Sequence, residues 1–182
     1  MNSELESNSS RGRSNLLYSY VWLTPTRFVL ILAALVAAFF PDILFGGRSL
    51  FFKDFGAFTY PNAFFQRESF QHGRLPLWNP LNNCGIPFLA QWNTVALYPL
   101  SLIYLILPLT WGLNFFLLVH LVLAGLGMYL LVSGWTKNRL AAAVGGVAFA
   151  FNGMTLNCLM WTSNLAALAW MPWVILMTEQ GW

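Results

Sequence analysis

The stretch "WGLNFFLLVHLVLAGLGMYLLVSGW", from Trp111 to Trp135, contains no charged residue and is followed almost at once by Lys137 and Arg139. As a helix rising about 1.5 Å per residue, it is longer than the roughly 30 Å of hydrocarbon in a bilayer. It therefore predicts a helix that crosses a membrane. Cations gather on the cytoplasmic side of such helices, so the pattern places Lys137 and Arg139 inside the cell.

The composition extends this interpretation to the whole chain. Of 182 residues, 58% are hydrophobic and only 8% are charged, whereas a soluble domain has about a quarter of its residues charged. No full charge occurs from Leu75 to Thr136 or from Leu140 to Thr178. The net charge of +3 comes from scattered cations, which argues against nucleic acid as a partner. The sequence predicts an all-α integral membrane protein.

The N-terminal part divides into a polar tail and an apolar run. Residues 1–21 are rich in Ser and Asn, and we expect a disordered cytoplasmic tail. Residues 22–45 are expected to form the first transmembrane helix, because the arginines of the N-terminal part precede its most apolar stretch. A cleaved signal peptide is the alternative, since Val36 and Ala38 suit a small-residue cleavage site.

Residues 46–110 are expected to form a large extracytoplasmic loop that carries juxtamembrane helices. Phe55 to Gln71 has a helical pattern, which Pro61 interrupts. Gly73 to Phe88 is dense in turn-forming residues and predicts an ordered irregular loop. Val95 to Pro108 is apolar, but as a helix it would reach only about 21 Å, too short to cross a bilayer.

The C-terminal part is expected to contain three of four membrane spans. Residues 111–135 form the second, a cytoplasmic turn at 136–139 follows, and residues 140–160 form the third. The polar patch Trp161 to Asn164 is expected to be an outside turn. Residues 164–180 form the fourth span, which is a candidate for truncation because the sequence stops directly after it.

Two features inside the apolar segments favour structural roles. Ala142, Gly146 and Ala150 lie four residues apart, and such a stripe of small residues lets another helix approach closely. We interpret it as ordinary bundle packing. His120 lies within the second span. An ionisable group at this depth is a functional candidate, but a hydrogen bond to a neighbouring helix explains it as well, and we favour that.

The sequence lacks the motifs that are typical of several kinds of catalytic and metal-binding site. It has no phosphate-cradling loop, no serine elbow and no metal pattern of paired Cys or His. Cys84 is predicted in the outer loop and Cys158 near the outer end of the third span. A disulfide between them is conceivable on an oxidising face, and two free thiols are the alternative.

Asp54 is the main candidate for chemistry. It lies in "SLFFKDFGAFTYP", Ser49 to Pro61, shortly after the first apolar run. A carboxylate at this position can take a proton from a hydroxyl group or hold a divalent cation. The alternative is that Asp54 pairs with Lys53 or Arg48 among lipid headgroups and only marks the membrane boundary.

Five ordered segments carry a family resemblance: "KDFGAFTYP", "HGRLPLWNPLNNCGIPFLAQ", "ALYPLSLIY", "VHLVLAGLGMYLL" and "AFAFNGM". Together they resemble the N-terminal part of the YfhO family of bacterial membrane proteins, over Phe52 to about Trp173. That family looks like a branch of the GT-C glycosyltransferases, which take sugars from polyprenyl phosphates. The resemblance implies a GT-C-like fold, and it implies an N-terminal fragment, because YfhO proteins are several times longer.

The resemblance also implies a site. In GT-C enzymes an acidic residue in the first outer loop is catalytic, and Asp54 matches it by position. Cations would neutralise the phosphate of the donor, although attraction to lipid headgroups is the alternative. Tryptophans would stack on a sugar, although a place in the membrane's aromatic belt is the alternative. The substrate-binding residues that we expect are Lys53, Arg48, Arg74, Trp78 and Trp92.

The expected function is transfer of a sugar from a polyprenyl-phosphate donor to a cell-envelope glycan acceptor, with Asp54 as base. The expected location is the bacterial inner membrane, with several passes, lipid contacts and a cytoplasmic N-terminus. No protein metal site is predicted; the cofactor is left open, with a divalent cation as one option. The alternatives are a non-catalytic lipid-binding, flippase-like or assembly protein, and a small transporter, which His120 keeps open.

Overall fold

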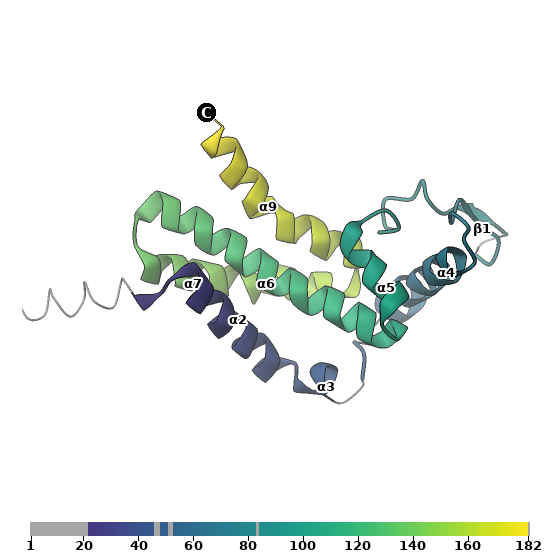
Figure 1. The fold of residues 1–182 in the computed structure, drawn as a ribbon, viewed down its shortest axis with the longest axis horizontal. Helices are drawn as coiled ribbons and strands as arrows, with labels where there is room; N and C mark the ends of the chain where they lie inside the picture. Colours follow the sequence, from purple (N-terminus) through teal and green to yellow (C-terminus); the bar gives the residue numbers. More distant parts are fainter. Residues whose placement is uncertain (1–21, 46–47, 51–52, 83, 182) are drawn as a thin grey trace, which may run out of the picture.

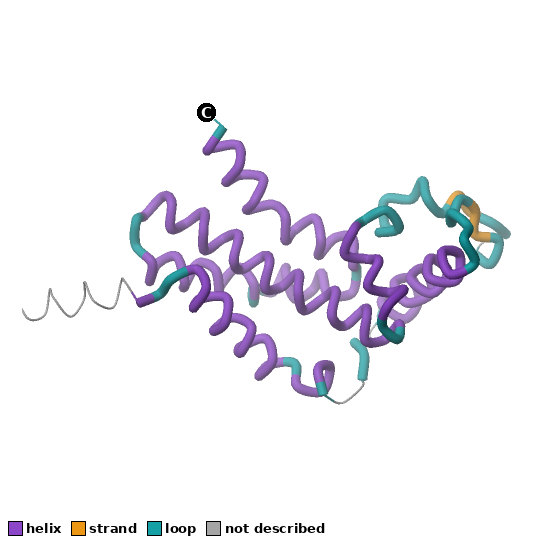
Figure 2. Tube along the Cα trace, in the orientation of Figure 1, coloured by secondary structure: helices purple, strands orange, loops and turns teal. Residues whose placement is uncertain are grey.

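The structure is a computed structural model that describes residues 22–45, 48–50, 53–82 and 84–181. The tail expected at residues 1–21 lies outside these ranges. The described chain is mostly helical, as the sequence predicted (Figures 1 and 2). Its longer helices are α2 (Pro25–Phe39), α4 (Tyr60–Gln71), α6 (Leu109–Thr136), α7 (Arg139–Ala150) and α9 (Thr162–Gln180).

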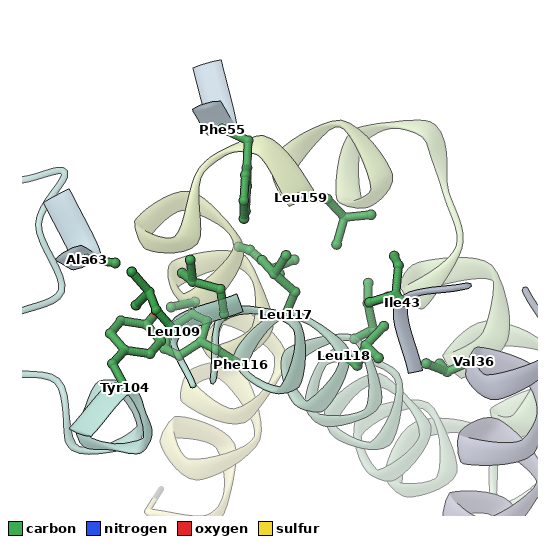
Figure 3. Close-up of a cluster of buried hydrophobic side chains, with 14 residues drawn as sticks. Val36, Ile43, Phe55, Ala63, Tyr104, Leu109, Phe116, Leu117, Leu118 and Leu159 are labelled. Carbon is green, nitrogen blue, oxygen red and sulfur yellow. The ribbon is translucent and has the colours of Figure 1, made fainter. Parts of the chain in front are cut away.

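Helix α6 is the centre of the fold and packs against α2, α7 and α9 (Figure 1). It extends the predicted helix 111–135 by two residues at its start and one at its end. Leu113, Phe116 and Leu117 of α6 are fully buried. Figure 3 shows this cluster, where the ring of Phe116 lies 5.7 Å from that of Tyr104. The helix predicted from the absence of charge is therefore covered by other helices along much of its length.

Among the described residues, two segments are long and apolar enough to cross a membrane by length and composition, Leu109–Thr136 and Arg139–Met160. Helix α2 is apolar but has only 15 residues, and α9 is not among the two. The second segment is not one smooth helix, because α7 gives way to α8 (Gly153–Asn157) and the 3₁₀ turn η3 (Cys158–Met160). The side chain of Asn152 caps α8 by accepting from the Thr155 amide at 2.9 Å.

The structure divides the helix that was expected over residues 22–45. Helix α2 ends at Phe39, and Pro41 begins the short helix α3 (Pro41–Leu44). A proline disfavours helical backbone in the residue before it and removes one amide donor. Accordingly, Phe40 leaves the helical region, with φ −124° and ψ 48°.

Helices α6 and α7 cross at two glycines. A Cβ atom on Gly146 would lie only 2.7 Å from the carbonyl oxygen of Gly125. In the other direction, a Cβ on Gly125 would lie 3.1 Å from the carbonyl oxygen of Gly146. All three small residues of the predicted α7 stripe are buried, which agrees with the expected role in bundle packing.

Hydrogen bonds place the start of α2 and the ends of α6 and α9 at one end of the bundle. The Tyr129 hydroxyl donates to the Leu23 carbonyl oxygen at 2.6 Å. The Trp135 indole donates to the Glu179 carboxylate at 2.9 Å. The α6–α7 turn with Lys137 lies at this same end (Figure 1).

At the opposite end, the amide side chain of Asn114 holds the first loop against α6. Its Nδ2 donates to the carbonyl oxygens of Ile43 at 3.2 Å and Arg48 at 2.7 Å. Its Oδ1 accepts from the Ser49 hydroxyl at 3.1 Å. Because each of these segments is fixed to α6, the loop that follows starts from a defined point.

A cap of short elements covers this second end (Figure 1). Pro61 does not end the helix expected from Phe55 to Gln71: the backbone stays helical, but it changes from a π-helix to the α-helix α4 next to Pro61. The irregular loop expected from Gly73 to Phe88 contains a small antiparallel hairpin. The other cap elements are the π-helix η1 (Phe55–Thr59), β1 (Trp78–Asn79), β2 (Ile86–Pro87), η2 (Pro99–Leu102) and α5 (Ile103–Ile106).

Candidate functional site

Asp54 lies at the N-terminal end of η1 and is partly buried. The next residue, Phe55, is fully buried in the cluster around α6. The Thr59 hydroxyl donates to the carbonyl oxygen of Met160 at 2.7 Å. These two contacts fix η1 against the bundle, so the backbone around Asp54 is held in place.

A cavity of about 220 Å³ opens beside Asp54, and we call it the Asp54 cavity. Asp54 is its only charged lining residue among those that the structure describes. Its walls come from η1, the start of α4, the loop before α5 and the start of α9. The remaining lining residues are Phe58, Thr59, Asn62, Trp92, Asn93, Trp161, Thr162 and Ser163.

Asn93 leaves an unused acceptor at this cavity. Its Oδ1 is buried and has no hydrogen-bond partner within the described ranges. Buried polar atoms in proteins are nearly always paired, so an unpaired one in a cavity wall suits a ligand that donates a hydrogen bond.

A mostly apolar hollow of about 380 Å³ adjoins the Asp54 cavity, and we call it the α9 groove. The two share Trp92 and Ser163. Ala166, Ala167 and Trp170 continue the same face of α9 along the groove. Residues of the loop before η2 form the opposite wall, namely Leu89, Thr94, Val95, Ala96, Leu97 and Tyr98. Both hollows have a mostly apolar lining with some polar groups, and the Asp54 cavity adds a carboxylate at one end of the combined space.

The predicted substrate-binding residues do not gather around Asp54. Trp92 lines the Asp54 cavity with 78% of its surface exposed, and Lys53 is the neighbour of Asp54 in the chain. Arg48 lies 3.8 Å from Asp42 in an exposed pair, which contributes little stability.

Arg74 and Trp78 line a different hollow of about 410 Å³, which we call the hairpin cavity. It lies at the C-terminal end of α4, where Glu68 is also part of its lining. Asp54 and Glu68 are fourteen positions apart on η1 and α4, or about 20 Å along a helix. The structure therefore places Arg74 and Trp78 at a different hollow from the one that Asp54 lines.

His120 is fully buried in a chain of hydrogen bonds. Its Nδ1 lies 2.6 Å from the Phe116 carbonyl oxygen, which can only accept, so Nδ1 carries the proton. Its Nε2 then accepts from the Tyr98 hydroxyl at 2.8 Å, and the Trp170 indole donates to that hydroxyl at 2.7 Å. This chain joins α6, α9 and the loop before η2, which supports the structural role expected for His120.

The two cysteines are free thiols in this structure. The disulfide that the sequence left open between Cys84 and Cys158 is therefore not formed. No group of three His, Cys, Asp or Glu side chains gathers within the described ranges. A divalent cation at the Asp54 cavity would find one carboxylate and the amide oxygens of Asn62 and Asn93, which are ligand types that such cations accept.

The polar wall of the Asp54 cavity was missed from the sequence. Thr162 and Ser163 belong to the patch assigned only to an outside turn, but α9 begins at Thr162 and presents them to Asp54. The prolines between Gly73 and Phe88 predicted that this loop is ordered. They did not indicate that Asn93, just after the loop, would line a cavity together with the start of α9.

Comparisons of the chain with protein-family models, with curated proteins and with solved structures found no match. The residues that the structure describes are mostly helical, and two of their helical segments have the length and composition to cross a membrane. The candidate site is the carboxylate of Asp54 in a cavity that adjoins the α9 groove.

Proposed function

We propose that the protein is a GT-C-like membrane glycosyltransferase, which moves a sugar from a polyprenyl-phosphate donor to a cell-envelope acceptor. One observation carries the proposal: the cavity that Asp54 lines adjoins a mostly apolar groove along α9. The resemblance to the N-terminal part of YfhO proteins supplies the reaction class.

The groove suits an amphiphilic donor. A polyprenyl chain needs an apolar channel, which the α9 groove offers between Ala166, Trp170 and Leu97. The phosphate and sugar need polar partners, which the Asp54 cavity offers. Thr162 and Ser163 form the first turn of α9, where free amide groups and the helix dipole favour a phosphate.

The chemistry assigns Asp54 the role of base. An acceptor hydroxyl attacks the anomeric carbon of the sugar while Asp54 takes the hydroxyl proton. The bond from the anomeric carbon to the phosphate oxygen breaks, and polyprenyl phosphate leaves with the electron pair. Trp92 is exposed at the cavity mouth, where its ring can cover the apolar face of a sugar.

The proposal includes a topology in the bacterial inner membrane, with a cytoplasmic N-terminus, four spans and the 46–110 loop outside. The short α6–α7 turn and the start of α2 lie at the same end, and their cations are Arg27, Lys137 and Arg139. Short cationic segments determine orientation. The outer loop also has cations, but a loop this long has little weight in that rule.

The test compares Asp54→Asn with the matched variant Asp42→Asn, which neutralises an exposed carboxylate outside the cavity. Membranes that contain each variant are given radiolabelled polyprenyl-phosphate hexoses, and label in the envelope glycan is counted. We expect Asp54→Asn to abolish transfer and Asp42→Asn to retain it, with equal amounts of inserted protein. Wild-type transfer by Asp54→Asn would contradict the proposal.

A second candidate is a non-catalytic protein that holds lipid. It is favoured by a nearly wholly apolar hollow of about 330 Å³ between α2, α3 and α6, lined among others by Val36, Leu118 and Val122. Binding of a polyprenyl phosphate that survives Asp54→Asn, with no product from the wild-type protein, would favour this candidate.

A further inference from the structure

The hairpin cavity is the largest hollow that we describe in the cap, and the proposed transfer at Asp54 does not use it. Its volume of about 410 Å³ lies within the range of small-molecule sites, about 300–1,000 Å³. It is lined by both aromatic and polar side chains. They include Phe64, Phe65, Glu68, Ser69, Arg74 and Trp78.

Trp78 is a fixed aromatic surface in this cavity. It lies on β1 opposite Pro87, and Asn79 beside it is buried and accepts from the Leu81 amide at 2.9 Å. One side of the indole packs on Gly85: a Cβ there would lie 2.6 Å from the ring. Trp78 nevertheless keeps 56% of its surface exposed. A large ring held by its backbone and open to the cavity loses little entropy when it binds a ligand.

The polar groups around Trp78 combine donors and acceptors. Arg74 only donates hydrogen bonds, the Glu68 carboxylate only accepts, and the Ser69 hydroxyl does both. Arg74 has no carboxylate within ion-pair distance in the described part of the chain, and Glu68 is only 3.9 Å from His72. An anionic ligand would be repelled by Glu68 and a cationic one by Arg74. Neutral hydroxyl groups can accept a hydrogen bond from Arg74 and donate one to Glu68.

The position of the cavity suits a ligand from water. The hairpin lies at the end of the molecule beyond α6 and away from the α6–α7 turn (Figure 1). The Asp54 cavity is at the other end of the η1–α4 segment. From an apolar ring face surrounded by hydroxyl-binding groups, we propose that the hairpin cavity is a saccharide-binding site, separate from the Asp54 cavity. This inference concerns binding alone and does not require transfer at Asp54.

The test is titration calorimetry on the full chain in lipid nanodiscs, because the sugar headgroups of maltoside detergents would compete. The probes are a tetramer of β-1,4-linked N-acetylglucosamine, a tetramer of α-1,4-linked glucose, and glycerol phosphate as a stand-in for a lipid headgroup. We expect at least one saccharide to bind and Trp78→Ala to weaken it about tenfold. Binding of glycerol phosphate alone, or of none of the probes, would overturn the proposal.

Further variants separate binding from folding and from the Asp54 site. Trp78→Phe keeps a ring and should retain most of the affinity, whereas Glu68→Gln and Arg74→Gln should each weaken it without removing packing. Trp135→Phe, in the last turn of α6 and far from the hairpin, is the matched control and should bind as the wild type does. Asp54→Asn should also leave saccharide binding unchanged. If Asp54→Asn removed binding and Trp78→Ala did not, the saccharide would belong to the Asp54 cavity and the proposal would fail.

Discussion

Thr59 and Met160 are joined by a hydrogen bond across 101 residues of sequence, from the Thr59 hydroxyl to the Met160 carbonyl oxygen at 2.7 Å. The bond fixes η1 to the end of the Arg139–Met160 segment. Asp54 and the start of α9 lie on either side of this contact and both line the Asp54 cavity. The contact therefore fixes one wall of the cavity, η1, to the segment that precedes α9.

Replacing Thr59 by Val keeps its shape and removes the donor. The Met160 carbonyl then loses its partner, and we expect a loss of about 1 kcal/mol in the free energy of unfolding. Thermal unfolding in nanodiscs measures this loss. Sugar transfer should also fall, because Asp54 is no longer held beside α9.

Thr178→Val is the matched control for this change. The Thr178 hydroxyl is exposed and donates only to carbonyls of its own helix, Val174 and Ile175. Its removal should leave both stability and transfer close to the wild type. Equal unfolding temperatures for the two variants would show that the Thr59 contact does not stabilise the cap.

Two tyrosines of the cap allow a second matched pair. Tyr98→Phe removes the hydroxyl that bonds His120 and Trp170, so the buried Nε2 of His120 loses its donor. We expect a loss of about 1–3 kcal/mol in the free energy of unfolding. Thermal unfolding of purified protein measures this loss. Transfer should also fall, because the lost hydroxyl holds Trp170, which lines the α9 groove.

Tyr104→Phe is expected to behave in the opposite way. Tyr104 is fully buried, and its hydroxyl has no hydrogen-bond partner in the described part of the chain. Burial raises the pKa of this hydroxyl, so it stays protonated at neutral pH. Removal of an unpaired buried hydroxyl should leave stability unchanged or increase it. A larger loss for Tyr104→Phe than for Tyr98→Phe would contradict the proposed hydrogen-bond chain.

The free thiols provide a test of the topology. Cys84 is exposed on the hairpin loop, so a membrane-impermeant maleimide should label it on intact cells without prior reduction. The double variant Cys84→Ala/Lys137→Cys moves the exposed thiol to the α6–α7 turn, where only broken cells should be labelled. Labelling of position 137 on intact cells would reverse the orientation. Labelling of Cys84 only after reduction would indicate a disulfide.

The features that local chemistry determines were predictable from the sequence. The uncharged run from Trp111 to Trp135 predicted α6 to within two residues at each end. The length and the lack of charge of such a helix are visible in the local sequence, without knowledge of what packs against it. Pro41 contained the information for the break at Phe40, although we had expected a continuous helix. The small-residue stripe of α7 predicted its buried face.

The features that depend on contacts distant in sequence were not predictable. Nothing local to Trp92 or Ser163 indicates that they share a wall with Asp54, since the chain brings them together only when α9 packs on α6. The same holds for Arg74 and Trp78. They are close to Asp54 in sequence, but the intervening helix α4 carries them to its other end.

The turn at Gly85 has φ +106° and leaves no room for a side chain beside the Trp78 indole. Alanine at this position would look conservative in a sequence comparison, because it adds a single methyl group at the surface. It would nevertheless push the indole off its support while the membrane-crossing helices kept their packing. The hairpin cavity would then be lost in a protein that still folds and inserts normally. Two proteins of the same architecture could therefore differ in saccharide binding through this single substitution.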